Sequence, residues 1–187
     1  MPGAGLKLLG FCGSLRKGSY NKKLLNIAAD LAEEQGAFVE VFDLSQIPLY
    51  NEDVKEKGFP DSAKLLRQKI ASSDGLLIAS PEYNYSVTGV LKNAIDWASR
   101  PPEQPLNGKP IAIFGASDGG FGTVRGQLHL RQVLFGVNAF VITSPQVHIA
   151  YANDAFDARG KLKEEKRTEQ LKKLVAALLK TIEKMKG

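Results

Sequence analysis

Short apolar runs alternate along this chain with longer stretches in which apolar residues recur every three or four positions. The short runs predict buried strands and the longer stretches predict amphipathic helices, so together they indicate βαβ units and a parallel sheet. We expect strands at residues 6–12, 37–42, 75–79, 110–114 and 139–143. We expect helices at residues 21–35, 62–72, 88–99 and 124–135, with one more helix near the C-terminus. This order predicts the α/β class, with a three-layer, doubly wound, five-stranded parallel sheet.

The length of 187 residues allows one domain with a full core, and no linker divides it, so we expect a single domain over residues 1–187. The formal net charge of +5 raises the question of a nucleic-acid partner. Residues 159–187 carry ten Lys and Arg against four Glu, so the basic charge belongs to the last helix. The apolar positions of that helix follow helical spacing: Leu171, Leu174, Val175, Leu178, Leu179 and Ile182. Because no aromatic or glycine-rich RNA motif accompanies the lysines, we expect a solvated helix face and no nucleic-acid partner.

The chain also lacks the sequence features of membrane insertion and export. It has no run of about 18 apolar residues, and its beginning lacks the basic and apolar regions of a signal peptide. Its single cysteine, Cys12, cannot form an internal disulfide, which agrees with a reducing compartment. We therefore expect a cytoplasmic protein with no membrane partner, and a small core residue at Cys12.

Three connections that follow predicted strands are rich in polar residues or glycine. They span residues 13–21, 80–89 and 115–122. Because the carboxyl ends of parallel strands open on the same edge of a sheet, we expect one composite site there. The first connection leads into a helix N-terminus and carries hydroxyl, guanidinium and amide donors at Ser14, Arg16, Ser19 and Asn21. This combination predicts a phosphate site.

Three familiar phosphate-site patterns do not match the first connection. A Walker A loop needs Lys after Gly and before Ser or Thr, whereas Lys17 precedes Gly18 and Ser19. The glycines do not follow G-x-G-x-x-G, although Asp43 remains a candidate ribose ligand as well as a solvated loop carboxylate. A cysteine phosphatase loop would place arginine six residues after Cys12, where Gly18 stands. These mismatches disfavour a hydrolase or transferase and favour a monophosphate that is held without being transferred.

The second and third connections suit a planar polar ring. The second combines a rigid turn, aromatic surface and amide groups in Pro81, Glu82, Tyr83, Asn84 and Tyr85. The third allows a close backbone approach at Gly119, Gly120 and Gly122. A phosphate site beside a site for a planar heterocycle predicts FMN.

The same motifs resemble those of the NAD(P)H-dependent FMN reductase family, which is flavodoxin-like, and most of all its quinone, chromate and azo-dye reductase branch. The matching segments are Gly13-Ser-Leu-Arg-Lys-Gly-Ser-Tyr-Asn21, Pro81-Glu-Tyr-Asn-Tyr-Ser86, Gly89-Val-Leu-Lys-Asn-Ala-Ile-Asp-Trp97 and Ser117-Asp-Gly-Gly120. The similarity covers nearly the whole chain, and the motifs stand in the same order on matching connections.

The resemblance implies a role for each of these segments. FMN would be bound at its phosphate end by Ser14, Arg16, Ser19, Tyr20 and Asn21, with Arg16 as the main charge partner. The ring would be lined by Pro81, Glu82, Tyr83 and Asn84, and closed on its third side by Ser117, Gly119 and Gly120. Members take hydride from NAD(P)H and pass electrons to quinones, azo dyes, chromate or flavin, so we expect small-molecule acceptors and a homodimer or homotetramer. Since the cofactor carries the chemistry, no catalytic residue is expected, and the spacing of His129 and His148 does not suit a metal.

Several residues keep two interpretations. Glu82 is either an acid of the site or a carboxylate that fixes the backbone or faces solvent. Trp97 departs from the apolar stripe of its helix, so it lies at the helix edge near a partner subunit or packs in the core. By the resemblance, Tyr50 and Asn51 lie near a subunit interface. Arg100, beside Pro101 and Pro102, either contacts a nicotinamide phosphate or is a solvated loop cation. For the whole chain, the alternative to a reductase is a flavodoxin-type electron-transfer protein without its own small-molecule substrate.

Overall fold

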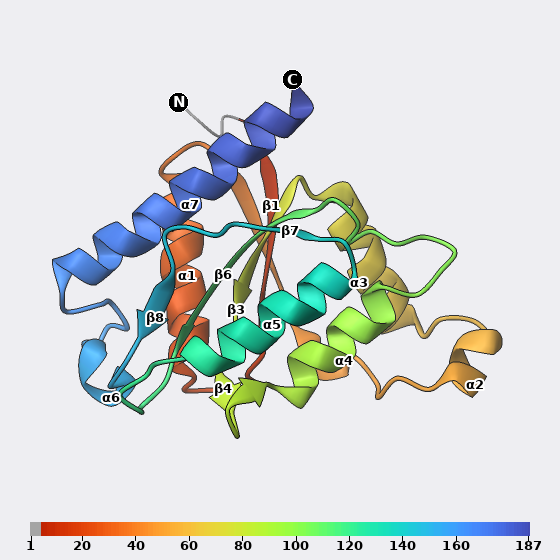
Figure 1. The fold of residues 1–187 in the computed structure, drawn as a ribbon, viewed down its shortest axis with the longest axis horizontal. Coiled ribbons are helices and arrows are strands. Elements are labelled where there is room, and N and C mark those ends of the chain that lie inside the picture. Colours follow the sequence, from red (N-terminus) through yellow and green to blue (C-terminus); the bar gives the residue numbers. More distant parts are fainter. Residues whose placement is uncertain (1–4) are drawn as a thin grey trace.

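The computed structural model describes residues 5–187 and contains a parallel sheet between two layers of helices (Figure 1). The sheet contains β1 (Lys7–Cys12), β2 (Phe38–Phe42), β3 (Gly75–Ala79), β6 (Pro110–Ala116), β7 (Phe140–Val141) and β8 (Val147–Ile149). Its order is β2-β1-β3-β6, and both β7 and β8 pair in parallel with β6. This is the flavodoxin-like order 2-1-3-4-5, which confirms the predicted doubly wound α/β fold.

Five long helices cover the two faces of the sheet. They are α1 (Tyr20–Glu33), α3 (Asp61–Ser72), α4 (Gly89–Ala98), α5 (Val124–Gly136) and α7 (Glu165–Lys186). Helices α1 and α7 cover one face, and α3, α4 and α5 cover the other (Figure 1). The shorter elements are η1 (Leu44–Gln46), α2 (Glu52–Glu56), α6 (Ala152–Ala155) and a two-stranded hairpin of β4 (Glu82–Tyr83) and β5 (Ser86–Val87). Within residues 5–187, none of the helices is both long and apolar enough to span a membrane.

The apolar runs of the sequence form the middle of the sheet, as their composition predicts. Every residue of β3 and β6 is buried, because these strands have neighbours on both sides and helices on both faces. Successive side chains alternate between the two layers: Leu77 packs with α1 and α7, whereas Leu76 and Ile78 pack with α3, α4 and α5. Helix α7 buries the same six apolar residues that its spacing predicts.

The last strand differs from the single strand expected at residues 139–143. It is interrupted, and its two parts, β7 and β8, flank a segment that contains Pro145. Proline has no N–H to donate to a strand ladder, so pairing with β6 stops and resumes. Two side chains of α5 bind carbonyl groups around the interruption: Arg131 Nη1 donates to Ile142 O at 3.0 Å, and Gln127 Nε2 donates to Val147 O at 2.9 Å.

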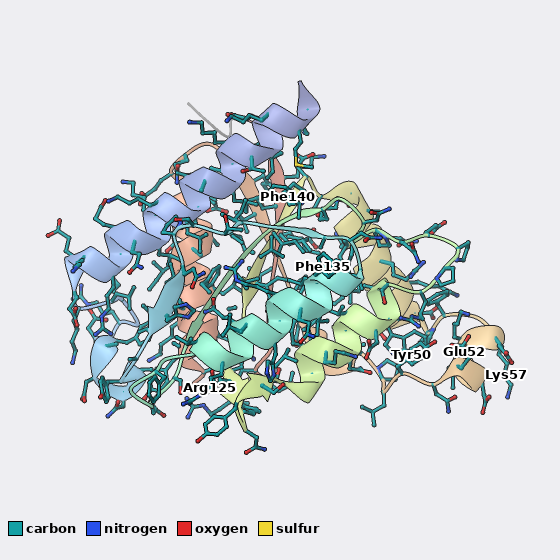
Figure 2. The ribbon with its side chains drawn as sticks, in the orientation of Figure 1. Tyr50, Glu52, Lys57, Arg125, Phe135 and Phe140 are labelled. Atoms are coloured by element: carbon teal, nitrogen blue, oxygen red, sulfur yellow. The ribbon has the colours of Figure 1, made fainter. Side chains whose placement is uncertain are left out.

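The side chain of Trp97 lies fully in the core. Its indole Nε1 donates to Pro48 O at 2.8 Å, and its ring centroid lies 4.8 Å from that of Tyr50 and 5.8 Å from that of Phe59. The core interpretation is therefore confirmed, and the helix-edge interpretation is wrong. Arg100 lies 5.4 Å from the centroid of the Tyr50 ring. Figure 2 shows Tyr50 at the end of the molecule that carries α2. Arg100 is thus a packed side chain rather than a solvated cation.

Candidate functional site

The connections after β1, β3 and β6 meet at one edge of the sheet, as the topology predicts. The first and second are in close contact, since a Cβ atom on Gly13 would lie 2.7 Å from Thr88 Oγ1. Thr88 caps α4 by accepting Leu91 N–H at 3.4 Å, and it donates to Gly13 O at 2.8 Å. One buried hydroxyl therefore fixes the start of α4 and joins the two connections.

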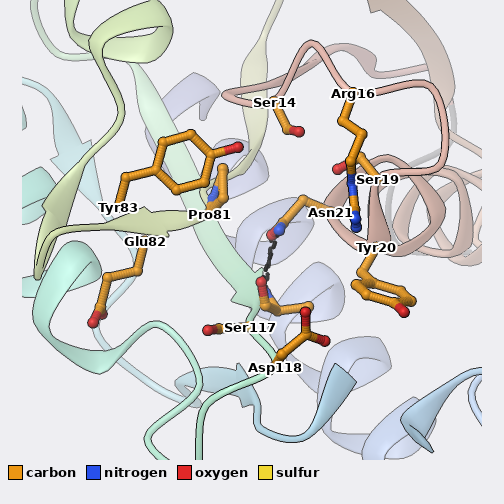
Figure 3. A pocket seen from close by; sticks show the side chains of 11 residues that line it. Ser14, Arg16, Ser19, Tyr20, Asn21, Pro81, Glu82, Tyr83, Ser117 and Asp118 are labelled. Atoms are coloured by element: carbon orange, nitrogen blue, oxygen red, sulfur yellow. Dashed lines mark hydrogen bonds between the residues drawn. The ribbon is translucent and has the colours of Figure 1, made fainter. Parts of the chain in front are cut away.

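A cavity of about 280 Å³ lies between the three connections (Figure 3). It is lined by Ser14, Arg16, Ser19, Tyr20, Asn21, Pro81, Glu82, Tyr83, Ala116, Ser117 and Asp118. Most of the predicted cofactor-binding residues are thus brought together around one space. Figure 3 shows Ser14 and Arg16 on one side of it and Tyr83 and Pro81 on the other.

A second cavity, of about 670 Å³, adjoins the first and shares Glu82 and Ser117 with it. Of the remaining predicted residues, Asn84 and Gly119 line this second space. Gly120 lines neither cavity, and a Cβ atom there would lie 2.7 Å from Tyr151 Oη. The two cavities together have the size typical of small-molecule sites.

The first connection presents donors that the protein itself does not use. Ser14 is buried, and its hydroxyl forms no hydrogen bond with any described residue. Arg16 lies 5.1 Å from the centroid of the Tyr20 ring and has no carboxylate within ion-pair distance among residues 5–187. Ser19 caps α1 by accepting Lys22 N–H at 3.4 Å, so the helix begins at the cavity. A buried hydroxyl, a free guanidinium and a helix N-terminus form a donor set that suits a phosphate.

The amide of Asn21 is already occupied in the structure. Its Nδ2 donates to Ala116 O at 2.8 Å, and its Oδ1 accepts Ala116 N–H at 2.9 Å. These two bonds link the first turn of α1 to the end of β6, 95 positions away along the chain. Asn21 lines the cavity, as predicted, and holds the first and third connections together rather than presenting a fully free amide.

The β4–β5 hairpin forms the opposite wall. Its two-residue turn has positive φ at Asn84 (51°) and Tyr85 (63°), the backbone conformation of tight hairpin turns. The carboxylate of Glu82 accepts Gly126 N–H at 2.8 Å, which fastens the hairpin to the first turn of α5. The interpretation of Glu82 as a backbone-fixing group is therefore confirmed.

The third connection closes the cavity, and two of the residues by which it lines that cavity, Ala116 and Asp118, were not predicted. Ser117 Oγ accepts Gly119 N–H at 3.3 Å, which shapes the turn. Asp118, which lies between them, also lines the cavity, and its Oδ1 accepts Asn153 N–H at 3.0 Å. The sequence signal that could have identified Asp118 was its position inside the Ser-Asp-Gly-Gly motif. Arg125, on the next helix, lines the second cavity and carried no motif signal at all.

Comparison with known proteins shows which family has this site. The model of the NADPH-dependent FMN reductase family matches residues 6–154. The chain belongs to this family. An NAD(P)H-dependent FMN reductase of Pseudomonas aeruginosa is 50% identical over 182 residues, which cover 97% of this chain and 98% of that protein. An NAD(P)H:quinone oxidoreductase of Solanum tuberosum is 42% identical over 187 residues, 97% and 95% of the two chains. The solved structure of FerB, a flavoenzyme NAD(P)H:(acceptor) oxidoreductase from Paracoccus denitrificans, superposes with a TM-score of 0.85 at 36% identity, covering 96% of this chain and 98% of that chain.

Family membership confirms the predicted resemblance and makes the chain an oxidoreductase that uses FMN and NAD(P)H. It decides against the alternative of a flavodoxin-type carrier without its own substrate. The residues present fit the cofactor. The donors at Ser14 and Arg16, which are unpaired within residues 5–187, suit its phosphate, and the wall formed by Pro81, Glu82 and Tyr83 suits a flat ring.

In this FMN reductase the other side chains that could react, Cys12 and His148, are packed within the fold. Cys12 is buried, and burial raises the pKa of its thiol, against smaller lowering effects of hydrogen bonds from the backbone N–H of Ser14 and the side chain of Ser19. The expectation of a small core residue at Cys12 is confirmed. Burial also lowers the pKa of His148. Within residues 5–187, no three His, Cys, Asp or Glu side chains are grouped as metal ligands.

Proposed function

We propose that residues 1–187 form a single FMN-binding domain that reduces quinones with electrons from NAD(P)H. The phosphate of FMN would bind at Ser14, Arg16 and Ser19, with its ring beside the β4–β5 hairpin and the turn at residues 117–119. The observation that carries this placement is a pair of donors facing the cavity, the Ser14 hydroxyl and the Arg16 guanidinium, which have no hydrogen-bond or ion-pair partner among residues 5–187. Quinones are proposed because the relative from Solanum tuberosum is named a quinone oxidoreductase.

The protein's own part in the reaction is to bind and orient. FMN, when bound, supplies hydride transfer and electron storage. The first connection holds the phosphate, which is remote from the reacting ring. The wider second cavity leaves room beside the ring for NAD(P)H and then for the acceptor, in alternation. No side chain is needed as a nucleophile, acid or base, so we assign no catalytic residue.

Substitution of Arg16 tests the placement of the phosphate. Arg16→Ala should weaken FMN binding by about 1.5 to 3 kcal/mol, the scale of a charged hydrogen bond, which corresponds to roughly 10- to 150-fold in Kd. FMN fluorescence is followed while apoprotein is titrated into the free cofactor. Lys17→Ala is the matched control, because it removes the same charge one residue away and Lys17 lines a different cavity.

Equal losses in Arg16→Ala and Lys17→Ala would show that the phosphate lies elsewhere. The proposed acceptors are tested separately by steady-state kinetics with a quinone, an azo dye, chromate and free flavin, each with NADH and NADPH. Failure of every quinone to oxidise the reduced protein would refute quinone reduction while leaving the FMN site intact.

A homodimer or homotetramer in the cytoplasm completes the proposal. Support for self-association comes from exposed apolar side chains on α5 and the neighbouring β7, where Leu128 is 58%, Phe135 82% and Phe140 50% exposed (Figure 2). The cytoplasmic location rests on the unpaired thiol of Cys12, which suits a reducing compartment, and cell fractionation tests it.

A further inference from the structure

The guanidinium of Arg125 stands beside the second cavity in an unusual setting. It lies 4.3 Å from the centroid of the Tyr85 ring and 4.5 Å from that of the Phe121 ring. Figure 2 shows it at the N-terminal end of α5, beside the β4–β5 hairpin. Both rings are 66% exposed, although aromatic side chains of this size are usually covered. Arg125 is therefore held in place by stacking from two separate connections.

The stacking leaves the hydrogen-bonding capacity of Arg125 unused. A guanidinium that lies against ring faces keeps the N–H donors at its planar edge free. Within residues 5–187, Arg125 has no side-chain hydrogen bond and no carboxylate within ion-pair distance. The carboxylate in the same cavity wall, Glu82, accepts Gly126 N–H instead. The result is an oriented cation whose charge no side chain in the described part of the chain neutralises.

The surroundings of Arg125 indicate what kind of group it would bind. Among the residues that line the second cavity it is the one cation, and the cavity adjoins the space assigned to FMN through Glu82 and Ser117. A simple quinone is uncharged and small. The hydride donor carries a pyrophosphate, an adenine ring that can stack on an aromatic surface, and in NADPH a further phosphate. The cavity volume of about 670 Å³ suits the larger of the two substrates.

We infer that Arg125 binds a phosphate group of the nicotinamide dinucleotide and so places the hydride donor over the flavin. This inference rests on the proposed FMN site, because it takes the flavin ring to lie between the two cavities. Tyr85 and Phe121 fix the guanidinium before the substrate arrives, so little side-chain freedom is lost on binding. Arg125 is a substrate-binding residue in this scheme and takes no part in proton or hydride transfer.

The test compares Arg125→Gln, Arg125→Lys and the control Arg159→Gln in FMN-loaded protein. Arg159 is exposed in the segment before α7, so its substitution changes the net charge equally without touching either cavity. Binding of NADP⁺ and NAD⁺ is measured by calorimetry, and KM and kcat are measured for NADPH, NADH and a neutral quinone. Flavin absorbance and FMN affinity are recorded for every variant.

Arg125→Gln should raise Kd and KM for the dinucleotide about tenfold or more, with kcat and the quinone KM changed less than about twofold. Arg125→Lys should recover part of the loss, and Arg159→Gln should match the wild type. A loss shared by NADH and NADPH assigns the pyrophosphate, and a loss confined to NADPH assigns the additional phosphate. Unchanged dinucleotide binding, or an effect on the quinone KM alone, would overturn the inference. Failure of wild-type protein to bind FMN would instead refute the proposed function.

Discussion

Replacement of Asn21 by Asp would test whether its amide joins the first and third connections. Asn21 is 4% exposed, and its side chain donates one hydrogen bond to Ala116 and accepts one from it. Aspartate has nearly the same shape and keeps the acceptor, but its ionised form cannot donate. Its second oxygen would then face Ala116 O at the position where Nδ2 lies, 2.8 Å away.

The cost follows from these two contacts. A buried acceptor left without its donor loses about 1 to 3 kcal/mol, and more where a charge is involved, so Asn21→Asp should destabilise the apoprotein by about 2 to 4 kcal/mol at pH 8. For a chain of this length that corresponds to a fall in Tm of about 4 to 16 °C. Burial beside a carbonyl disfavours the charged form, so the pKa of the new carboxyl is raised in the folded state. Stability is then present at low pH and lost as the pH rises through the folded-state pKa, so the deficit should shrink at pH 5.

Urea unfolding of the apoprotein at pH 8 and pH 5 measures both effects. The fluorescence of Trp97, the one tryptophan of the chain and fully buried, reports the transition. Asn26→Asp is the matched control, because Asn26 is exposed on the same helix and receives the same change of charge. If Asn21→Asp loses no more stability than Asn26→Asp, or loses as much at pH 5 as at pH 8, the assigned role of the amide is incorrect.

Two further predictions concern α5 and its neighbours. The pKa of His148 is lowered mainly by burial and also by Arg131, against the opposing effect of Glu82. Below about pH 6.5 the unfolded chain therefore binds more protons at this residue than the folded chain does, so the free energy of unfolding decreases as the pH is lowered. His148→Gln should lessen this fall in urea unfolding between pH 7.5 and 5.5, and an identical decline in both proteins would contradict it. Phe135→Lys should reduce the molecular mass measured by light scattering, because a charge would replace an apolar side chain in the proposed self-association surface, which also contains Phe140. A monomeric wild-type protein would refute self-association.

The parts of the fold that follow local periodicity could be predicted from the sequence. The strands and helices that build the two layers have patterns of period two or near 3.6 that need no knowledge of distant residues. The interrupted last strand could not be predicted in this way. Pro145 signals a break, but strand pairing resumes at β8. Gln127 and Arg131 of a separate helix donate hydrogen bonds to the carbonyl groups on either side of the break. Such compensation depends on contacts that no window of sequence contains.

In the candidate site, too, some features could be predicted from the sequence and others depend on contacts between distant residues. Topology alone predicts that the three connections meet, because parallel strands end on one edge. The engagement of Asn21 with Ala116 was not predictable, since an amide in a polar motif looks the same whether it faces a ligand or a backbone 95 positions away. Trp97 appeared misplaced because its partner is the segment around Pro48 rather than the sheet. Arg125 gave no signal, because its stacking partners come from two different connections.

The polar side chains of this site fall into two groups according to whether the protein already satisfies them. Asn21, Thr88 and Glu82 each bind backbone atoms of a different connection, so they fix the edges of the cavities. Arg16 and Arg125 have no anionic partner among the described residues, and they line the two adjoining cavities. An unneutralised cation at a preformed site favours binding of a negatively charged group. Two such cations, one in each cavity, agree with the proposal that the site holds two phosphorylated molecules, FMN and the nicotinamide dinucleotide, with their rings in contact.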